Sequence, residues 1–278
     1  MNVMKDVLAV LRESVTVPLI ANLPHSSTHI PTSIRKSFVL DDNELEVELL
    51  KMTDWYVDQL FSCLNDIGGI SVIYNISRLV LDPERFEDDE DEDMADVGMG
   101  VIYTKISDGN KLRANTPSEE ERQELLNRFY RPYHKAIEDE TQSLLDFFGR
   151  CLILDCHSFP SEPLPYELNQ DPNRPDICLG TDPYHTPKEL IDLAERFFGK
   201  HDLATARNMP FEGTYVPLKF LGTEKRISSL MVEINRKLYM DEATGKKSQA
   251  FDQVRSIVTD MVKCITANIL HLQLPRSP

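Results

Sequence analysis

The sequence predicts an α/β protein in which helices cover a buried β-sheet. Short apolar runs alternate with longer amphipathic stretches along the 278 residues, and this alternation is typical of α/β folds. The runs are continuously apolar rather than alternating, which indicates strands buried on both faces. No linker-like composition divides the chain, and its length still allows one large core, so we expect a single domain over residues 1–278.

The predicted strands are the apolar runs of the chain. The clearest runs are Val17–Leu23, Ile70–Tyr74, Cys151–Asp155 and Ser228–Ile234, and the shorter runs Asp176–Leu179 and Tyr215–Leu218 are predicted as additional strands. Between the runs, Asp42–Leu64 and Ser248–Leu270 carry apolar side chains at helical spacing and are predicted helices.

Two more helices are predicted from their first residues. Each begins with Thr-Pro-x-Glu, in which Thr116 or Thr186 is the expected N-cap, the proline lies in the first turn and the glutamate completes a capping box. We expect these helices to end near Phe148 and Phe198, and Pro132 predicts a kink in the first of them.

The charge excludes some classes of partner. The chain has 46 acidic and 30 basic side chains and a net charge of −16, which disfavours binding to nucleic acid and to anionic membranes. The N-terminal residues resemble neither a signal peptide nor a membrane span. The five cysteines form no CxxC pair, which indicates reduced thiols in a cytoplasmic protein.

Residues 84–96 are far more acidic than the rest of the chain. They include nine acidic residues and one arginine, a local charge of −8 that is half of the total. Because like charges repel, the segment is predicted to be a solvated loop. A calcium site is the alternative, but the order of ligands in an EF-hand and its central glycine are missing.

Three polar clusters follow predicted strands, where an α/β sheet forms its binding crevice. The first two contain His25 and His157, each followed by serine. Imidazole is the usual nitrogen ligand of zinc, and a catalytic zinc site has three protein ligands. Asp54 is a candidate for the third. We predict that His29 lies at the surface or behind the site and that His134 has a structural or rim role.

Glu233 belongs to the third cluster and lies within an apolar strand. A carboxylate there is costly unless it is paired or lies near a metal. Two interpretations are equally compatible with the spacing. Glu233 forms an ion pair with Arg236 or Arg78, or it is a general base beside a metal-bound water.

Seven segments in a common order resemble the N-formylglutamate amidohydrolase family, which shares a fold and a metal site with zinc carboxypeptidases and aspartoacylase-like deacylases. The segments are Pro24-His25-Ser26, Thr53-Asp54-Trp55, Ser77-Arg78-Leu79-Val80-Leu81-Asp82, Arg131-Pro132-Tyr133-His134, Asp155-Cys156-His157-Ser158, Phe211-Glu212-Gly213-Thr214-Tyr215 and Tyr239-Met240-Asp241-Glu242. The resemblance implies a three-layer α/β/α fold with a central mixed, largely parallel sheet, of the zinc-carboxypeptidase and phosphorylase/hydrolase type.

The resemblance also implies roles for individual residues. A divalent metal, zinc as the first choice, would be held by His25, Asp54 and His157. Glu233 would be the catalytic glutamate, and Arg78 would act in catalysis and in substrate binding. Substrate would also be bound by Arg85, Gly213, Thr214 and Tyr215. Family members usually read Asp-Leu-Asn-Arg where this chain has Asp82-Pro83-Glu84-Arg85, and we expect the added carboxylate to weaken selection for a dicarboxylate.

The predicted activity is metal-dependent hydrolysis of the N-formyl amide of N-formyl-L-glutamate, which the resemblance connects with histidine breakdown. The partner is then a small N-acyl amino acid. Two alternatives stay open: a deacylase or carboxypeptidase-like hydrolase of another N-acyl amino acid or peptide, and a non-catalytic relative that binds an amino acid.

Overall fold

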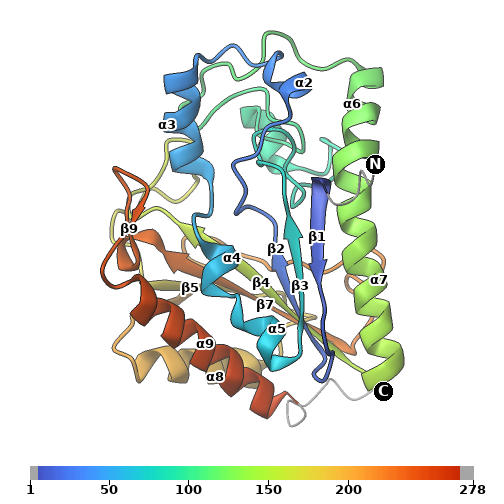
Figure 1. The fold of residues 1–278 in the computed structure, drawn as a ribbon, viewed down its shortest axis with the longest axis vertical. Coiled ribbons are helices and arrows are strands. Elements are labelled where there is room, and N and C mark those ends of the chain that lie inside the picture. The colour runs from blue at the N-terminus through green and yellow to red at the C-terminus, as the bar shows by residue number, and fades with distance from the viewer. Residues whose placement is uncertain (1–5, 270–278) are drawn as a thin grey trace.

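The fold is built on one seven-stranded sheet, described for residues 6–269 by a computed structural model (Figure 1). The strands in chain order are β1 Leu8–Leu11, β2 Leu19–Leu23, β3 Ile70–Tyr74, β4 Cys151–Phe159, β5 Ile177–Gly180, β6 Thr205–Arg207 and β7 Ile227–Asn235. Their order across the sheet is β1-β3-β2-β4-β7-β5-β6. The pairs β1–β3 and β5–β7 are antiparallel and the other four are parallel. The predicted mixed, largely parallel sheet is thus confirmed.

Helices cover both faces of this sheet. The long α7 packs against β2, β3 and β4, whereas α4, α5, α8 and α9 lie together on the opposite face (Figure 1). The helices are α2 Thr32–Arg35, α3 Asp42–Met52, α4 Val57–Leu60, α5 Cys63–Ile67, α6 Glu119–Leu125, α7 Arg131–Phe148, α8 Lys188–Gly199 and α9 Phe251–Asn268. A short hairpin of β8 Met240–Asp241 and β9 Lys246–Lys247 precedes α9.

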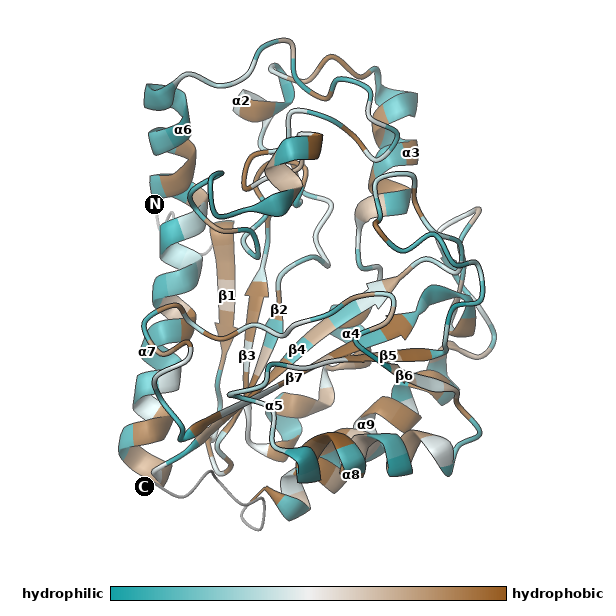
Figure 2. Ribbon diagram, turned by 180° about the vertical axis from the view of Figure 1, so that it is seen from behind, coloured by the Kyte–Doolittle hydropathy of each residue, from teal (hydrophilic) through white to brown (hydrophobic). Residues whose placement is uncertain are grey.

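Successive side chains of each central strand enter different cores. Ile20 and Ile153 belong to the core beneath α7, whereas Leu19 and Leu152 belong to the core beneath α8 and α9. Side chains alternate between the two faces of a strand, so both faces are apolar and the strand sequence is continuously apolar. The brown colour of the central strands shows this composition (Figure 2).

The helix predicted over Asp42–Leu64 is wrong, because the segment forms three short helices. Thr53 is extended, and Tyr56 adopts a left-handed conformation with φ of 64°. Apolar residues before the break, such as Leu45, enter the first core, and those after it, such as Leu60, enter the second. Helical spacing persists across the break, so periodicity alone did not reveal it.

The strand predicted at Tyr215–Leu218 is also wrong. The backbone N–H of Tyr215 donates to the Asp155 carboxylate at 2.8 Å, and Pro217 begins a turn in which its carbonyl accepts from Phe220. Proline has no N–H for a sheet ladder, and the segment instead lines the end of β4. The edge strands β1 and β6 were not predicted. The last helix ends at Asn268, and Leu270 lies outside the described residues.

The two predicted capping boxes do not form at the threonines. Ser118 caps α6 and forms a capping box with Glu121, two residues after the predicted position. Thr186 instead donates to the carbonyl of Ser229, and α8 begins without a side-chain cap. Near Pro132 the chain stays helical and forms a π turn over Leu126–Tyr130, because the missing N–H of proline disturbs the regular hydrogen-bond ladder.

The acidic segment is only partly the solvated loop that was predicted. Glu87 and Asp89 pair with Arg131 and Arg122 of the long helical segment. Glu92 is buried and accepts backbone N–H groups of its own loop, and Glu84 points towards the end of β4. Glu92 and Glu84 face inward because hydrogen-bond donors are available to them there. The local charge of the segment contains no information about those donors.

The five cysteines are free thiols, and four of them are buried. None of the helices between residues 6 and 269 is long and apolar enough to cross a membrane.

The cap of α6 gives a test of the fold. Ser118→Ala removes the side-chain oxygen that accepts the Glu121 N–H, and we expect it to lower the free energy of unfolding by about 1 kcal/mol. Thr116→Ala is the matched control, because Thr116 is exposed and two residues before the cap. Urea unfolding measures both variants, and an equal loss in both would contradict the assignment of the cap.

Candidate active site

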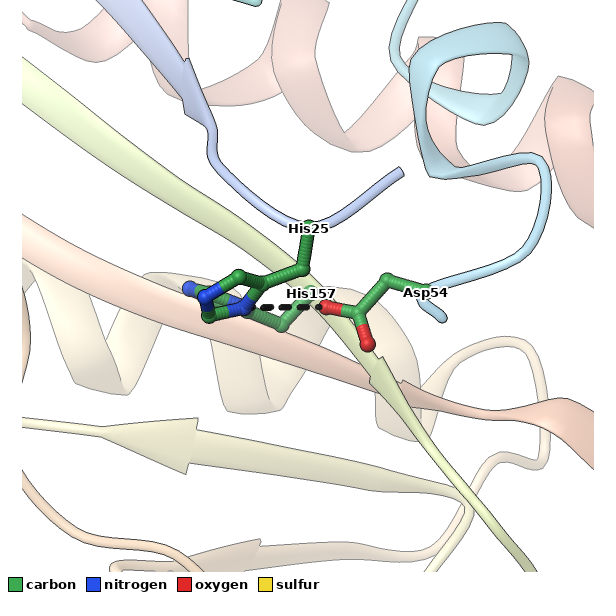
Figure 3. A group of neighbouring side chains, drawn as sticks. All are labelled: His25, Asp54 and His157. Carbon is green, nitrogen blue, oxygen red and sulfur yellow. Dashed lines mark hydrogen bonds and ion pairs between the residues drawn. The ribbon is translucent and has the colours of Figure 1, made fainter. Parts of the chain in front are cut away.

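The site lies at the carboxyl ends of the neighbouring parallel strands β2 and β4. Their register pairs Asn22 with Asp155, so His25, just after β2, lies near His157 in β4. The break after α3 brings in Asp54, whose backbone N–H donates to the carbonyl of His25 at 3.0 Å. Figure 3 shows these two imidazoles and the Asp54 carboxylate converging.

The three converging side chains are deeply buried and close. Asp54 Oδ2 lies 3.0 Å from His157 Nδ1 and 3.8 Å from His25 Nδ1, and each of the three residues is at most 3% exposed. His25 Nδ1 has no hydrogen-bond partner in the described structure. One ligand atom from each residue fits within 4.8 Å of the others, so the group could hold one metal ion.

The outer nitrogen of each imidazole faces a carboxylate. His25 Nε2 lies 2.7 Å from Asp82 Oδ1, and His157 Nε2 lies 2.9 Å from Asp155 Oδ1. A carboxylate that accepts the Nε2 proton leaves the Nδ1 lone pair directed at the shared centre, as in the carboxylate–histidine arrangement of metal sites. Asp82 and Asp155 therefore orient the two histidines.

Electrostatics at this centre favour a cation. Burial lowers the pKa of His157, but Glu84 and Asp155 outweigh burial and raise that pKa well above its usual value. Burial raises the pKa of Asp54, but the neighbouring imidazoles of His157 and His25 dominate and hold it well below its usual range. Carboxylates thus stabilise positive charge between the imidazoles, where protons or a metal ion can provide it.

A second group, formed by Glu84, Asp155 and His157, also has metal-compatible spacing. Its carboxylates already bind protein donors, because Asn22 Nδ2 donates to both of them and the Tyr215 N–H donates to Asp155. We therefore interpret this group as the support of His157 rather than as a second cation site.

Glu233 lies on β7 directly opposite His157 in the strand register. It is 8% exposed, and its Oε2 atom has no hydrogen-bond partner in the described structure. Burial raises its pKa to about 8. Arg236 pairs with Asp54 at 3.1 Å and Arg78 with Asp82 at 2.7 Å. The ion-pair interpretation of Glu233 is therefore wrong for both arginines.

The two arginines predicted to bind substrate have different surroundings. Arg78 directs Nε and Nη2 at Asp82 Oδ2, and its Nε also lies 3.2 Å from the Tyr103 hydroxyl. Arg85 Nε is buried without a hydrogen-bond partner in the described structure, 3.8 Å from Asp82 and 4.0 Å from Glu92. Arg85 is therefore the more available of the two guanidinium groups.

A pocket of about 510 Å³ connects these groups. It is lined by both histidines, Asp54, Glu233, Arg78, Arg85 and the predicted Gly213, Thr214 and Tyr215. The Thr214 hydroxyl bonds to Ser229, and the Tyr215 hydroxyl bonds to His134 at 3.1 Å. These side chains are fixed by the protein, so they shape the wall of the pocket.

His29 and His134, whose positions the sequence analysis also predicted, lie as expected. His29 is exposed. His134 lies at the pocket wall, 2.8 Å from the carbonyl of Pro83, and burial lowers its pKa to about 4.

Sequence reasoning gave no role to Asp82 and Asp155, and it did not predict that Arg236 pairs with Asp54 or that Glu84 lies beside His157. The position of Asp155 could have been predicted from the sequence. It is two residues before His157 in a predicted strand, so the two side chains share one face of that strand. Arg236 and Asp82 had no comparable signal, since their partners Asp54 and His25 are distant in sequence.

Comparison with known proteins identifies the family. Residues 17–240 match the model of the family described as FGase, N-formylglutamate amidohydrolase. The chain belongs to this family. It is accordingly a hydrolase of amide bonds, and the seven segments that carried the resemblance run through most of the matched region.

Similar proteins support this assignment. An N-formylglutamate deformylase of Pseudomonas putida is 30% identical over 232 residues, which cover 81% of this chain and 83% of that protein. One from Pseudomonas aeruginosa is 25% identical and covers 90% and 93%. The crystal structure of an N-formylglutamate amidohydrolase from Ralstonia eutropha JMP134 superposes with a TM-score of 0.85 at 25% identity, covering 96% of this chain and 99% of that one.

The raised pKa of Glu233 predicts a pH-dependent loss of stability. Between pH 4.5 and about 8 the carboxyl is protonated in the folded metal-free protein and ionised in the unfolded chain. The folded state binds the extra proton, so stability falls as pH rises through this window. Glu233→Gln removes this titrating group. As pH rises through the window, the free energy of unfolding of the variant minus that of the parent should increase by up to about 1.4 kcal/mol per pH unit. Urea unfolding of metal-free protein at pH 5, 6, 7 and 8 measures this difference, and a constant difference would contradict it.

Proposed function

We propose that the protein hydrolyses N-formyl-L-glutamate to L-glutamate and formate. The observation that supports this most is the Glu233 carboxylate, whose Oε2 atom has no hydrogen-bond partner in the described structure, in one pocket with the converging His25, Asp54 and His157. The names of the similar proteins from Pseudomonas supply the substrate. We place the reaction in the cytoplasm and in histidine breakdown, as the resemblance and the free thiols suggest.

We propose that His25 Nδ1, His157 Nδ1 and Asp54 hold a divalent metal, with zinc as the first choice. The donor set fits zinc, because two imidazoles and one carboxylate leave a fourth position open. The buried, unpartnered His25 Nδ1 is an independent sign of a missing cation. When bound, the metal supplies Lewis acidity towards an amide carbonyl and a water molecule.

Glu233 is proposed as the proton carrier of the reaction. A metal cation would favour its ionised form and lower its pKa from about 8 towards neutrality, which suits a group that takes and returns a proton near pH 7. It would accept a proton from the attacking water and donate it to the leaving amine. No hydrogen bond in the described structure occupies its Oε2 atom.

Arg85 is proposed to bind a carboxylate of the glutamate moiety. Its guanidinium is the more available one, and the fork of an arginine matches a carboxylate. Arg78 is held by Asp82 and would present its remaining edge to the substrate or to the negative charge that develops on the carbonyl oxygen. The backbone at Gly213 and the fixed Thr214 and Tyr215 complete the wall.

The metal site can be tested through the carboxylate behind His25. Asp82→Asn keeps the shape of the side chain but removes the charge that orients the imidazole, and we expect zinc affinity to fall by about 10- to 100-fold. Titration against a chromophoric chelator measures this. Asp252→Asn is the control, because Asp252 is on α9 and its side chain is exposed. Unchanged affinity in Asp82→Asn would contradict the proposed orientation.

The reaction itself is tested with zinc-loaded protein and N-formyl-L-glutamate. We expect release of formate, and Glu233→Gln should lower kcat by about 10²- to 10⁴-fold because it removes a general acid–base group. The variant should retain its zinc. Glu189→Gln, on the exposed surface of α8, should keep full activity. Absence of formate from the parent protein would overturn the proposed substrate, and near-normal kcat in Glu233→Gln would overturn its role.

A further inference from the structure

Exposed apolar side chains surround the mouth of the pocket. Phe86 is 44% exposed, Leu168 93%, Leu218 53% and Leu221 36%, and all four line the pocket. They come from three segments that are distant in sequence: the acidic loop, the segment after β4 and the segment before β7. Single exposed apolar residues are common, but several that line one concave pocket indicate a binding surface.

The apolar surface continues from the mouth into the pocket. Val216 is buried, and Leu164 packs against the same core beneath the rim. Both line the pocket. The pocket therefore has a polar floor, formed by the histidines, Glu233 and the arginines, and an apolar wall that reaches the solvent. We call Phe86, Leu168, Leu218 and Leu221 the apolar rim.

We propose that the apolar rim binds an alkyl acyl group, so that the protein also hydrolyses N-acyl-L-glutamates whose acyl chain is longer than formyl. This inference rests on the proposed function. A formyl group is one carbon with no apolar surface to bury, and it leaves the rim without a role. In an N-acyl amino acid held by Arg85 through its carboxylate, the acyl carbon is the end of the substrate that is free to extend.

The surroundings of the arginines support the same substrate class. Arg78 is already paired with Asp82 and Arg236 with Asp54, and Arg85 has the carboxylates of Asp82 and Glu92 at 3.8 and 4.0 Å. Charge alone therefore provides limited selection for a small dicarboxylate. Apolar contact at the rim is a second source of affinity, because the binding energy of an alkyl chain grows with its buried area.

The experiment compares N-formyl-, N-acetyl-, N-butanoyl- and N-hexanoyl-L-glutamate with zinc-loaded protein, and released glutamate is the common readout. Full burial of one methylene corresponds to about a fourfold gain, so we expect about twofold per methylene at a half-exposed rim. The comparison runs from acetyl to hexanoyl, because the formyl carbonyl is intrinsically more reactive. We expect kcat/KM to rise about 16-fold over the four added methylenes, at about twofold each.

Two variants test whether the rise in kcat/KM with acyl length depends on the apolar rim. Leu168→Ser combined with Leu218→Ser should lower the hexanoyl-to-acetyl ratio of kcat/KM by about fourfold, since it removes two of the apolar contacts. Phe147→Ser is the control, because Phe147 is an apolar residue on α7 outside this pocket whose exposure of 79% lies between those of Leu168 and Leu218. It should leave the ratio unchanged.

The outcomes separate this inference from the proposed function. Formate release from formylglutamate together with a flat or falling acyl series overturns the rim proposal alone.

If no substrate is hydrolysed, the proposed function fails, and calorimetric titration of the same compounds into zinc-loaded Glu233→Gln protein still tests the rim. Affinity that rises from acetyl to hexanoyl supports the rim proposal, and equal affinity overturns it. Faster hydrolysis of N-formyl peptides extended at the glutamate carboxylate than of N-formyl-L-glutamate itself also overturns it, because the rim would then face the other end of the substrate.

Discussion

Buried charges at the carboxyl ends of β2 and β4 constrain this structure more than any other feature. Asp54, Asp82 and Asp155 are each at most 2% exposed, and an unpaired carboxylate in such surroundings would cost several kcal/mol. Each one therefore has a cationic or hydrogen-bonding partner. Asp54 lies beside both imidazoles and pairs with Arg236. Asp82 contacts His25 and Arg78, and Asp155 contacts His157. These pairings fix the imidazole rings and leave both Nδ1 atoms near the Asp54 carboxylate.

The fold departs from regular geometry where this network requires it. The helical segment after Asp42 stops at Met52, and a left-handed Tyr56 restarts it. Left-handed conformations are costly for residues other than glycine, yet this one lies in the turn that delivers Asp54. Tyr215 similarly gives its backbone N–H to Asp155 and not to a neighbouring strand. In both places a buried carboxylate competes successfully with regular secondary structure.

Glu233 is the exception among the buried acids, and this exception indicates chemistry. It shares the strand register of His157, but no arginine between residues 6 and 269 forms an ion pair with it. Natural proteins rarely leave a buried carboxylate oxygen without a donor unless the site uses it. The floor of the pocket is therefore rigid where it orients the imidazoles, and it keeps free acceptor atoms at His25 Nδ1 and Glu233 Oε2.

The sequence by itself determined the class of fold, the central strands and several residues of the site. Continuous apolar runs predicted β3 with its observed bounds and the central residues of β2, β4 and β7. They did so because a strand buried on both faces is apolar at nearly every position. His25, His157 and Glu233 were recognisable because a polar side chain at the end of a buried strand is unusual. Asp54 was the named candidate for the third ligand.

Only the tertiary structure decided which charges meet. Asp82 meets His25, Arg236 meets Asp54 and Glu84 meets Asn22 across 57, 182 and 62 residues of the chain. No local pattern encodes a contact between such distant positions. The break after Met52 was hidden for the same reason, since its cause is a carboxylate that must reach the imidazoles of β2 and β4. Local sequence shows which segments are apolar enough to be buried, whereas the packing of distant segments decides which group lies beside each buried charge.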